Sequence, residues 1–117
     1  MNQKDSGLKL AEHSRTITPE RAIVTANEHC IFNYSFGLIG TTPHLLAMAD
    51  KEAWVVPIVL TSPGFGAVGE VGIVAVDAVT GQVVGSTPRP EVEAAQKSLR
   101  EVHHDAIEAA FLRAKQA

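Results

Sequence analysis

The chain has 117 residues, the usual size of one domain, so we expect a single hydrophobic core. Hydrophobic residues make up 45% of the sequence and charged residues 20%, a balance that excludes a wholly disordered chain. The formal net charge of −3 predicts no affinity for nucleic acid, and the lack of a long apolar run predicts no membrane span. The single cysteine and the absence of a signal-like apolar segment at the start predict a cytoplasmic protein.

The N-terminal part of the chain divides into a polar tail and a helix. We predict that residues 1–17 form a mobile tail and that residues 18–117 form one domain. Thr18 can accept from free amides of a first helical turn, and Pro19 loses no hydrogen bond there, so a helix should span roughly 19–36. Its apolar stripe comprises Ala22, Ile23, Ala26, Cys30, Ile31 and Tyr34, with Gly37 as a stop signal.

The middle of the chain has the composition of β-strands. Residues 44–49 can form a short strand, and residues 53–61, rich in β-branched side chains, predict the central strand. Pro57 argues against a central position, because proline cannot donate to a ladder. Residues 61–69 are expected to form a flexible connection to the next strand.

A hairpin is expected next. Strands at 70–77 and 82–86 are separated by a short loop in which Gly81 can take a positive φ. These segments are too short for the crossover helices of a parallel sheet, so the sheet should be antiparallel with three or four strands.

The C-terminal part of the sequence predicts one long helix, from about 90 to 115. Its apolar residues follow a heptad-like seam of Val92, Ala95, Leu99, Val102, Ala106 and Ala109. The seam can pack on a second copy, giving a homodimer, or on the chain's own sheet. The predicted fold class is therefore α+β: an N-terminal helix on a 3–4-stranded antiparallel sheet, followed by a long C-terminal helix.

Motifs for catalysis or cofactors are weak. The glycines at 64, 66 and 69 fit G-x-G-x-x-G, but a strand rather than a helix follows, so no dinucleotide site is expected. His104 and Glu108 share a helix face without a zinc-motif spacing, which favours a solvated pair. Cys30 lies in the apolar stripe and is expected to be a buried, inert thiol. We predict no catalytic residue, no cofactor and no metal.

Candidate residues for binding a protein partner are few. Phe65 between Gly64 and Gly66 can form an apolar loop tip that either packs or contacts a partner. Trp54 in the central strand and Leu99, the largest side chain of the seam, complete the set, although both also suit packing in the monomer.

Three short motifs resemble the PepSY-like domains: Ile17–Ala22 at the start of the helix, Ala53–Val56 in a strand, and Val74–Val84 in the hairpin. The resemblance implies a helix packed on an antiparallel sheet and a non-enzymatic domain that binds or inhibits a peptidase. The Trp54 strand and the Asp77-x-x-Thr80-Gly81 hairpin are also similar to some small bacterial immunity proteins, which bind one toxin.

The leading prediction is a small non-catalytic binding or regulatory module with an unidentified protein partner. The alternative is a small-ligand-binding protein or an enzyme with a cavity between the first helix and the sheet. An exposed apolar patch would favour the module, whereas convergent polar groups in a cavity would favour the alternative.

Overall fold

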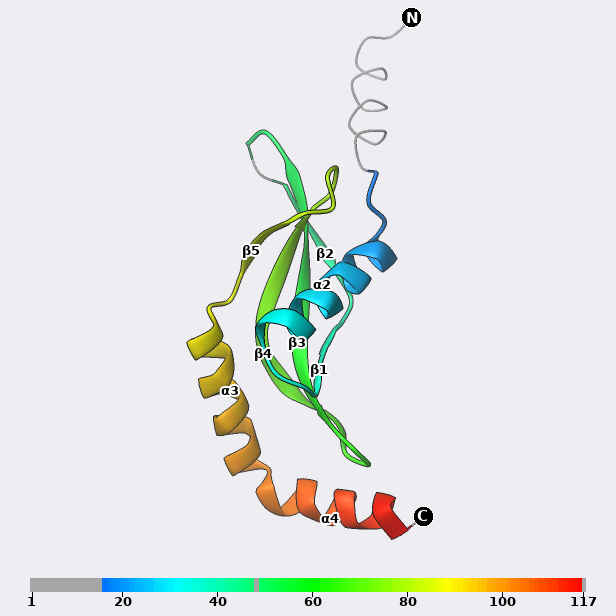
Figure 1. Cartoon of the computed structure of the whole chain (residues 1–117), viewed down its shortest axis with the longest axis vertical. Coiled ribbons are helices and arrows are strands. Elements are labelled where there is room, and N and C mark those ends of the chain that lie inside the picture. The colour runs from blue at the N-terminus through cyan, green and yellow to red at the C-terminus, as the bar shows by residue number, and fades with distance from the viewer. Residues whose placement is uncertain (1–15, 48, 117) are drawn as a thin grey trace, which may run out of the picture.

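The computed structural model of the chain describes residues 16–47 and 49–116 and has an α+β fold (Figure 1). Along the chain come α2 (Pro19–Asn33), β1 (Leu38–Gly40), β2 (His44–Ala47), β3 (Glu52–Ser62), β4 (Gly66–Asp77), β5 (Val83–Ser86), α3 (Arg89–Val102) and α4 (His104–Gln116). The predicted fold class, with an N-terminal helix, an antiparallel sheet and C-terminal helices, is confirmed.

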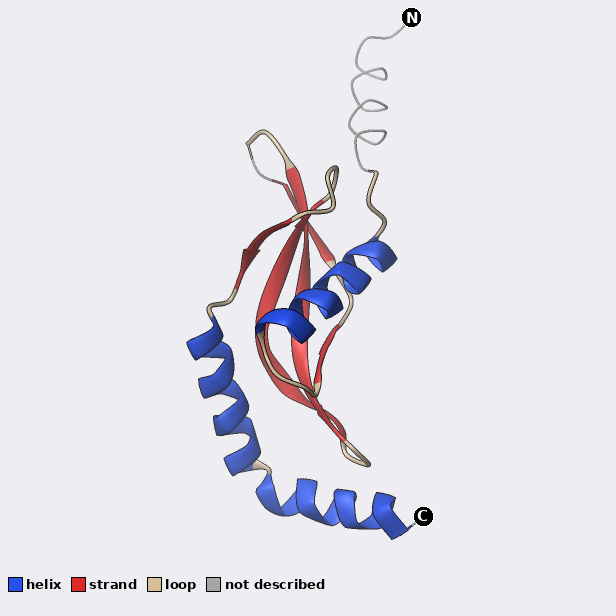
Figure 2. Ribbon diagram, in the orientation of Figure 1, coloured by secondary structure: helices blue, strands red, loops and turns tan. Residues whose placement is uncertain are grey.

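The sheet has five strands, all paired antiparallel, one strand more than the prediction allowed. Its order is β1-β3-β4-β5, and β2 also pairs with β3. Because β4 occupies one edge of β3, β1 and β2 share the other edge: β1 lies beside Ile58–Leu60 and β2 beside 52–55. Figure 2 shows α2 crossing in front of the strands, with α3 and α4 along the side and end of the sheet.

The two faces of β3 differ sharply in burial. Val56, Ile58 and Leu60 are at most 1% exposed, whereas the alternate residues between and beside them are only partly buried. Successive side chains of a strand point to opposite faces, so one face of the sheet is covered and the other is not. The covered face packs against small residues of α2, Ala22, Ala26 and Cys30, and against Val92 of α3.

We call the uncovered side of the sheet the open face. Strand register assigns to it Ile39, His44, Leu46, Ala53, Val55, Pro57, Val59, Glu70, Ile73, Ala75, Asp77 and Gly85. Two of these residues, Ala53 and Asp77 at the end of the sheet near the β4–β5 turn, are buried. The core cluster beneath the helices contains residues of both α2 and α3, so the two helices that contact the sheet cover the same face. The open face carries no described helix.

Pro57 is accommodated in the central strand by a break in the neighbouring edge. Its carbonyl accepts from the Thr41 amide (2.9 Å) and the Thr41 hydroxyl (3.1 Å), on the side of β1 and β2. The N–H and C=O of one residue point to the same side of an antiparallel strand, so the missing N–H also faces this edge. The edge strand is interrupted between Gly40 and His44, where no ladder donor is available from Pro57.

The predicted start of the first helix is confirmed, and its end comes three residues early, at Asn33. The Thr18 side chain accepts from the Arg21 amide at 3.1 Å, and Pro19 occupies the first turn. Residues 1–15 of the predicted tail lie outside the described residues. Ile17 packs against the core cluster, and its carbonyl accepts from Trp54 Nε1 at 2.8 Å.

The prediction of a long loop over 61–69 is wrong. The strands β3 and β4 continue into this segment, pair Thr61 with Ala67, and leave only Pro63, Gly64 and Phe65 between them. Two register shifts, between Ile58 and Val59 and between Leu60 and Thr61, let the glycine-rich stretch pair despite its poor strand propensity. The glycines therefore make the strand harder to predict from the sequence, but they do not end it.

The prediction of one continuous C-terminal helix is also wrong, because the helix breaks at His103 into α3 and α4. His103 has φ −105° and ψ 14°, outside helical geometry. Phe65, in the β3–β4 turn, lies against it with ring centroids 5.9 Å apart. The break divides the predicted seam: Val92, Ala95 and Leu99 pack on the chain's own sheet, whereas Val102 is exposed.

The β4–β5 turn confirms the positive φ predicted for Gly81, which is +76°. Asp77 organises this turn: its carboxylate accepts from the Val79 and Thr80 amides at 2.8 and 2.9 Å. These hydrogen bonds stabilise the charged form and lower the pKa of Asp77.

We expect Gly81→Val to lower the free energy of unfolding by about 1 to 3 kcal/mol, since a β-branched residue is strained at this φ. An added Cβ would also lie 2.9 Å from Ile17 Cδ1. Urea unfolding followed by circular dichroism measures the change, with Gly85→Val as the control, because Gly85 has only Ala75 Cβ nearby, at 3.9 Å. An unchanged midpoint for Gly81→Val would contradict the turn geometry.

Candidate functional site

The structure places Gly64 and Phe65 in the β3–β4 turn, beside the C-terminal helices, and Gly66 at the start of β4. The Phe65 ring packs on His103, and a Cβ at Gly64 would lie 2.4 Å from the Ala110 carbonyl oxygen. Gly66 has φ +88°, and nothing lies within 4 Å of the position its Cβ would occupy. Gly64 and Phe65 thus join the turn to the C-terminal helices within the monomer.

Leu99 and Trp54 lie at different ends of the sheet and do not form a site together. The Leu99 side chain packs on Gly69, where an added Cβ would lie 2.8 Å from its Cδ2. Trp54 packs against the core cluster beside Ile17, which accepts its indole hydrogen bond. Both residues therefore have contacts that account for their positions by packing alone.

The titratable residues considered for chemistry are dispersed. His104 Nδ1 lies 3.3 Å from Asp105 Oδ1 and 3.8 Å from Glu108 Oε2, on an exposed helix surface. Within residues 16–47 and 49–116, no three His, Cys, Asp or Glu side chains are grouped where they could hold a metal ion. Cys30 is buried, and desolvation raises the pKa of its thiol to about 11, so it is almost entirely un-ionised at neutral pH.

The two most exposed large apolar side chains of the described residues, Phe32 and Phe36, lie at the C-terminal end of α2 and just after it. Ile31 is 65% exposed, Phe32 is 83% exposed, and Phe36, in the loop to β1, is 89% exposed. We call these three residues the aromatic tip. Full hydration of two phenylalanine rings is unfavourable by the same effect that drives core formation, so three such side chains within six residues of the chain make this segment a candidate interaction site.

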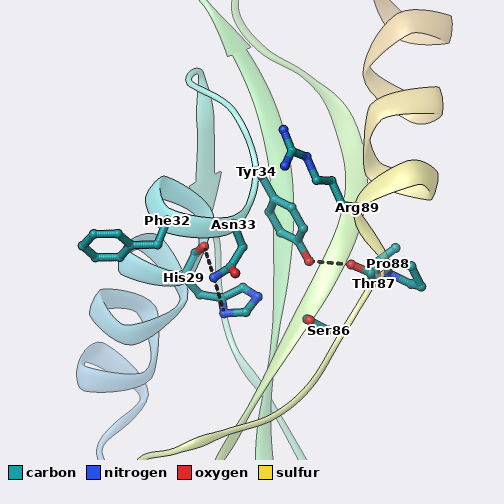
Figure 3. Close-up of a pocket in the computed structure, with 8 residues that line it drawn as sticks. All are labelled: His29, Phe32, Asn33, Tyr34, Ser86, Thr87, Pro88 and Arg89. Atoms are coloured by element: carbon teal, nitrogen blue, oxygen red, sulfur yellow. Dashed lines mark hydrogen bonds between the residues drawn. The ribbon is translucent and has the colours of Figure 1, made fainter.

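A cleft of about 310 Å³ adjoins the aromatic tip, between the end of α2 and the start of α3 (Figure 3). It is lined by His29, Phe32, Asn33, Tyr34, Ser86, Thr87, Pro88 and Arg89. In Figure 3, Tyr34 reaches across toward Thr87, whose carbonyl accepts from the Tyr34 hydroxyl at 2.6 Å. The Phe32 ring lies at the opposite end from Arg89 and points away from the cleft.

The polar side chains of the cleft have free hydrogen-bonding capacity beyond their internal contacts. The Asn33 side-chain nitrogen donates to the His29 carbonyl (3.0 Å) and lies 3.2 Å from His29 Nδ1. Desolvation lowers the pKa of His29, which favours the neutral ring at pH 7. Arg89 Nε pairs with Glu93 at 2.8 Å, which leaves further guanidinium donors in an exposed position.

A second cleft, of about 340 Å³, lies where the β3–β4 turn meets α3 and α4. Its lining is more apolar, with Ile107 and Phe111, and Arg100 and Glu108 also line it. Both clefts are open to solvent and shallow, so neither encloses a small molecule on all sides.

The aromatic tip was not predicted from the sequence: Ile31 was expected in the apolar stripe of the helix, and no role was expected for Phe32 or Phe36. The available signal was Phe32, which comes two residues after Cys30 and therefore lies on the opposite side of the helix from Ala22, Ala26 and Cys30. Phe32 lies in solvent if these small residues face the sheet.

The chain was compared with family models, with curated proteins and with solved structures, and none of the three comparisons gave a match. Among the described helices, none has both the length and the apolar character that crossing a bilayer requires.

Proposed function

We propose that the chain is a non-catalytic binding or regulatory module that holds another protein through the aromatic tip. The observation that carries this proposal is the exposure of Ile31, Phe32 and Phe36 beside a polar cleft. Protein interfaces commonly combine aromatic anchors with a surrounding rim of adaptable polar groups. Here the anchors are the two phenylalanines, and His29, Asn33 and Arg89 supply the polar groups.

The kind of partner follows from the resemblances in the sequence. A PepSY-like module would bind a peptidase, and an immunity-like module would bind a toxin. In both cases the partner needs an apolar pocket deep enough for a phenylalanine ring, flanked by groups that hydrogen-bond with a neutral imidazole, a carboxamide and a guanidinium.

The alternative is a small-ligand-binding protein, and the cleft itself is the observation in its favour. Its volume of about 310 Å³ is at the lower end of the range for ligand pockets, roughly 300 to 1,000 Å³. The cavity expected between the first helix and the sheet is a less favourable location, because side chains fill that contact. An added Cβ at Gly40 would lie 2.8 Å from Val56 Cγ1 and 3.6 Å from Ala26 Cβ.

The test is quantitative affinity capture from a lysate of the organism that encodes the chain, using the wild type and the double variant Phe32→Ser/Phe36→Ser. We expect one protein to be enriched by the wild type and to fall by roughly tenfold or more with the double variant, since loss of aromatic anchors removes most of an interface's binding energy. The matched control is Phe111→Ser on α4, which removes another exposed phenylalanine and should leave capture unchanged.

Circular dichroism establishes that the variants are folded, as their exposed positions lead us to expect. Equal capture by the wild type and the double variant would contradict the proposal. Native mass spectrometry of protein purified from the same cells tests the alternative function. A small molecule bound to the wild type and absent from Asn33→Ala would identify a ligand-binding protein instead.

A further inference from the structure

We propose that the open face of the sheet docks a second copy of this chain, sheet against sheet, to form a homodimer. This interface is separate from the aromatic tip and does not depend on which protein that surface binds. It also differs from the predicted homodimer through the C-terminal helix, for which Val102 and Leu112 remain exposed.

The first argument is the chemistry of the open face. Its central positions are Val55, Pro57 and Val59 on β3 and Ile73 and Ala75 on β4, and none is ionisable. An antiparallel sheet that faces water normally alternates apolar with polar side chains, whereas here both faces of β3 are apolar. A strand with this composition on both sides is typical of a sheet buried on both faces.

The ionisable side chains of this face lie at its margin. Glu70 pairs with Val59 near the β3–β4 turn, and His44 pairs with Val55 on the edge strand β2. Both residues are exposed, whereas Asp77, at the other end of β4, is buried and accepts from the Val79 amide of its own turn. A second apolar sheet can therefore cover the centre of the face while Glu70 and His44 stay hydrated at the rim.

The open face reaches the minimum size for a dimer. Residues 53–61 of β3 extend about 30 Å at 3.3 Å per residue, and β3, β4 and the edge formed by β1 and β2 are roughly 14 Å wide at about 4.8 Å per strand. The four residues of β5 widen the sheet at one end only. The area is about 500 Å² per copy, or about 1,000 Å² in total, the least that a specific interface needs.

The shape of the face favours a copy of the same chain as the occupant. Sheets that pack face to face match when both have the same twist, and they then cross at about 30°. A second copy has this twist by identity, and it presents an equally uncharged centre. If a two-fold axis relates the two copies, each copy uses the same face, so no open face remains for a third copy and assembly stops at the dimer.

The test is sedimentation equilibrium of the wild type and of lysine variants over micromolar concentrations. We expect the wild type to have twice the mass of one chain. Val59→Lys should raise the dissociation constant by roughly 100-fold or more, because each copy would bring a long, charged side chain into the apolar contact. The monomer should tolerate this lysine, since Glu70 lies directly opposite on β4 and can pair with it.

Two matched variants locate the contact. Val24→Lys introduces the same charge at an exposed valine of α2, and Leu112→Lys introduces it on α4; both should remain dimeric. A single-chain mass for the wild type throughout the range, or a dimer that persists in folded Val59→Lys, overturns the proposal. Dissociation by Leu112→Lys alone also overturns it and assigns the dimer to the C-terminal helix.

Circular dichroism shows whether Val59→Lys is folded. If it is not, Ile39→Lys takes its place, because Ile39 is 45% exposed on an edge strand of the same face and pairs with Val59. A dimer that persists in folded Ile39→Lys then overturns the proposal, and dissociation supports it.

Discussion

Replacing Ile58 with alanine should lower the free energy of unfolding by about 2 to 5 kcal/mol, the range for large-to-small changes in a tightly packed core. Ile58 is the largest of the fully buried side chains and lies on the covered face of β3, beneath the helices. The loss has two sources: the removed methyl and methylene groups return to water on unfolding, and the cavity they leave is only partly refilled.

Urea unfolding followed by the fluorescence of Trp54, the single tryptophan, measures this change. Ile39→Ala is the matched control, because it removes the same atoms from a side chain that is 45% exposed on the open face. We expect the control to cost less than about 1 kcal/mol at protein concentrations low enough for a monomer. Equal losses for the two variants would mean that the faces are equally buried, contrary to the structure.

The second large effect is expected for Leu99→Glu, which should lower the free energy of unfolding by about 2 to 4 kcal/mol. Leu99 packs its methyl groups directly on Gly69, so a carboxylate at this position would lie against the sheet. The glutamate can escape only by moving α3 away from β4, and this movement would also expose Val92 and the buried Gln96.

Leu112→Glu is the control for this substitution, since Leu112 is exposed on α4. We expect it to change stability by less than about 0.5 kcal/mol, as for most surface substitutions. Comparing Leu99→Glu with Leu112→Glu also shows whether Leu99 belongs to the monomer core or to a dimer seam, the two roles that the sequence left open. Unfolding at lower urea identifies a residue of the monomer core, whereas dissociation into folded single chains would identify a residue of a dimer seam.

The parts of the fold that the sequence predicts are those fixed by local chemistry. Thr18 and Pro19 start α2 through a side-chain cap and a residue without an amide, and Gly81 marks a turn that needs positive φ. These signals act within a few residues, so they are visible without knowledge of the rest of the chain.

The parts that the sequence does not predict depend on contacts between distant residues. No glycine or proline marks the break at His103, where Phe65, from another part of the chain, packs. The strand at 66–69 is formed by pairing with β3, against the preference of its glycines. β1 is only three residues long and was not predicted.

The candidate site was missed for a related reason. Apolar residues occur around most of α2, so periodicity alone does not decide which stripe faces the sheet. The large apolar side chains of Ile31 and Phe32 would be expected in the core. However, α2 approaches Gly40 and Val56 so closely that the contact requires small residues such as Ala26. The bulky side chains are therefore excluded from the contact and lie in solvent.

The three-residue connection between β3 and β4 also bears on how the chain reaches this structure. Closing so short a turn costs little chain entropy, so the longest pair of strands can form from neighbouring segments without a search. The α2–sheet contact and the β1–β3 pairing join residues farther apart, so they should follow once this hairpin offers a surface. α3 packs on strands that this hairpin already contains, so its docking should complete the core rather than start it.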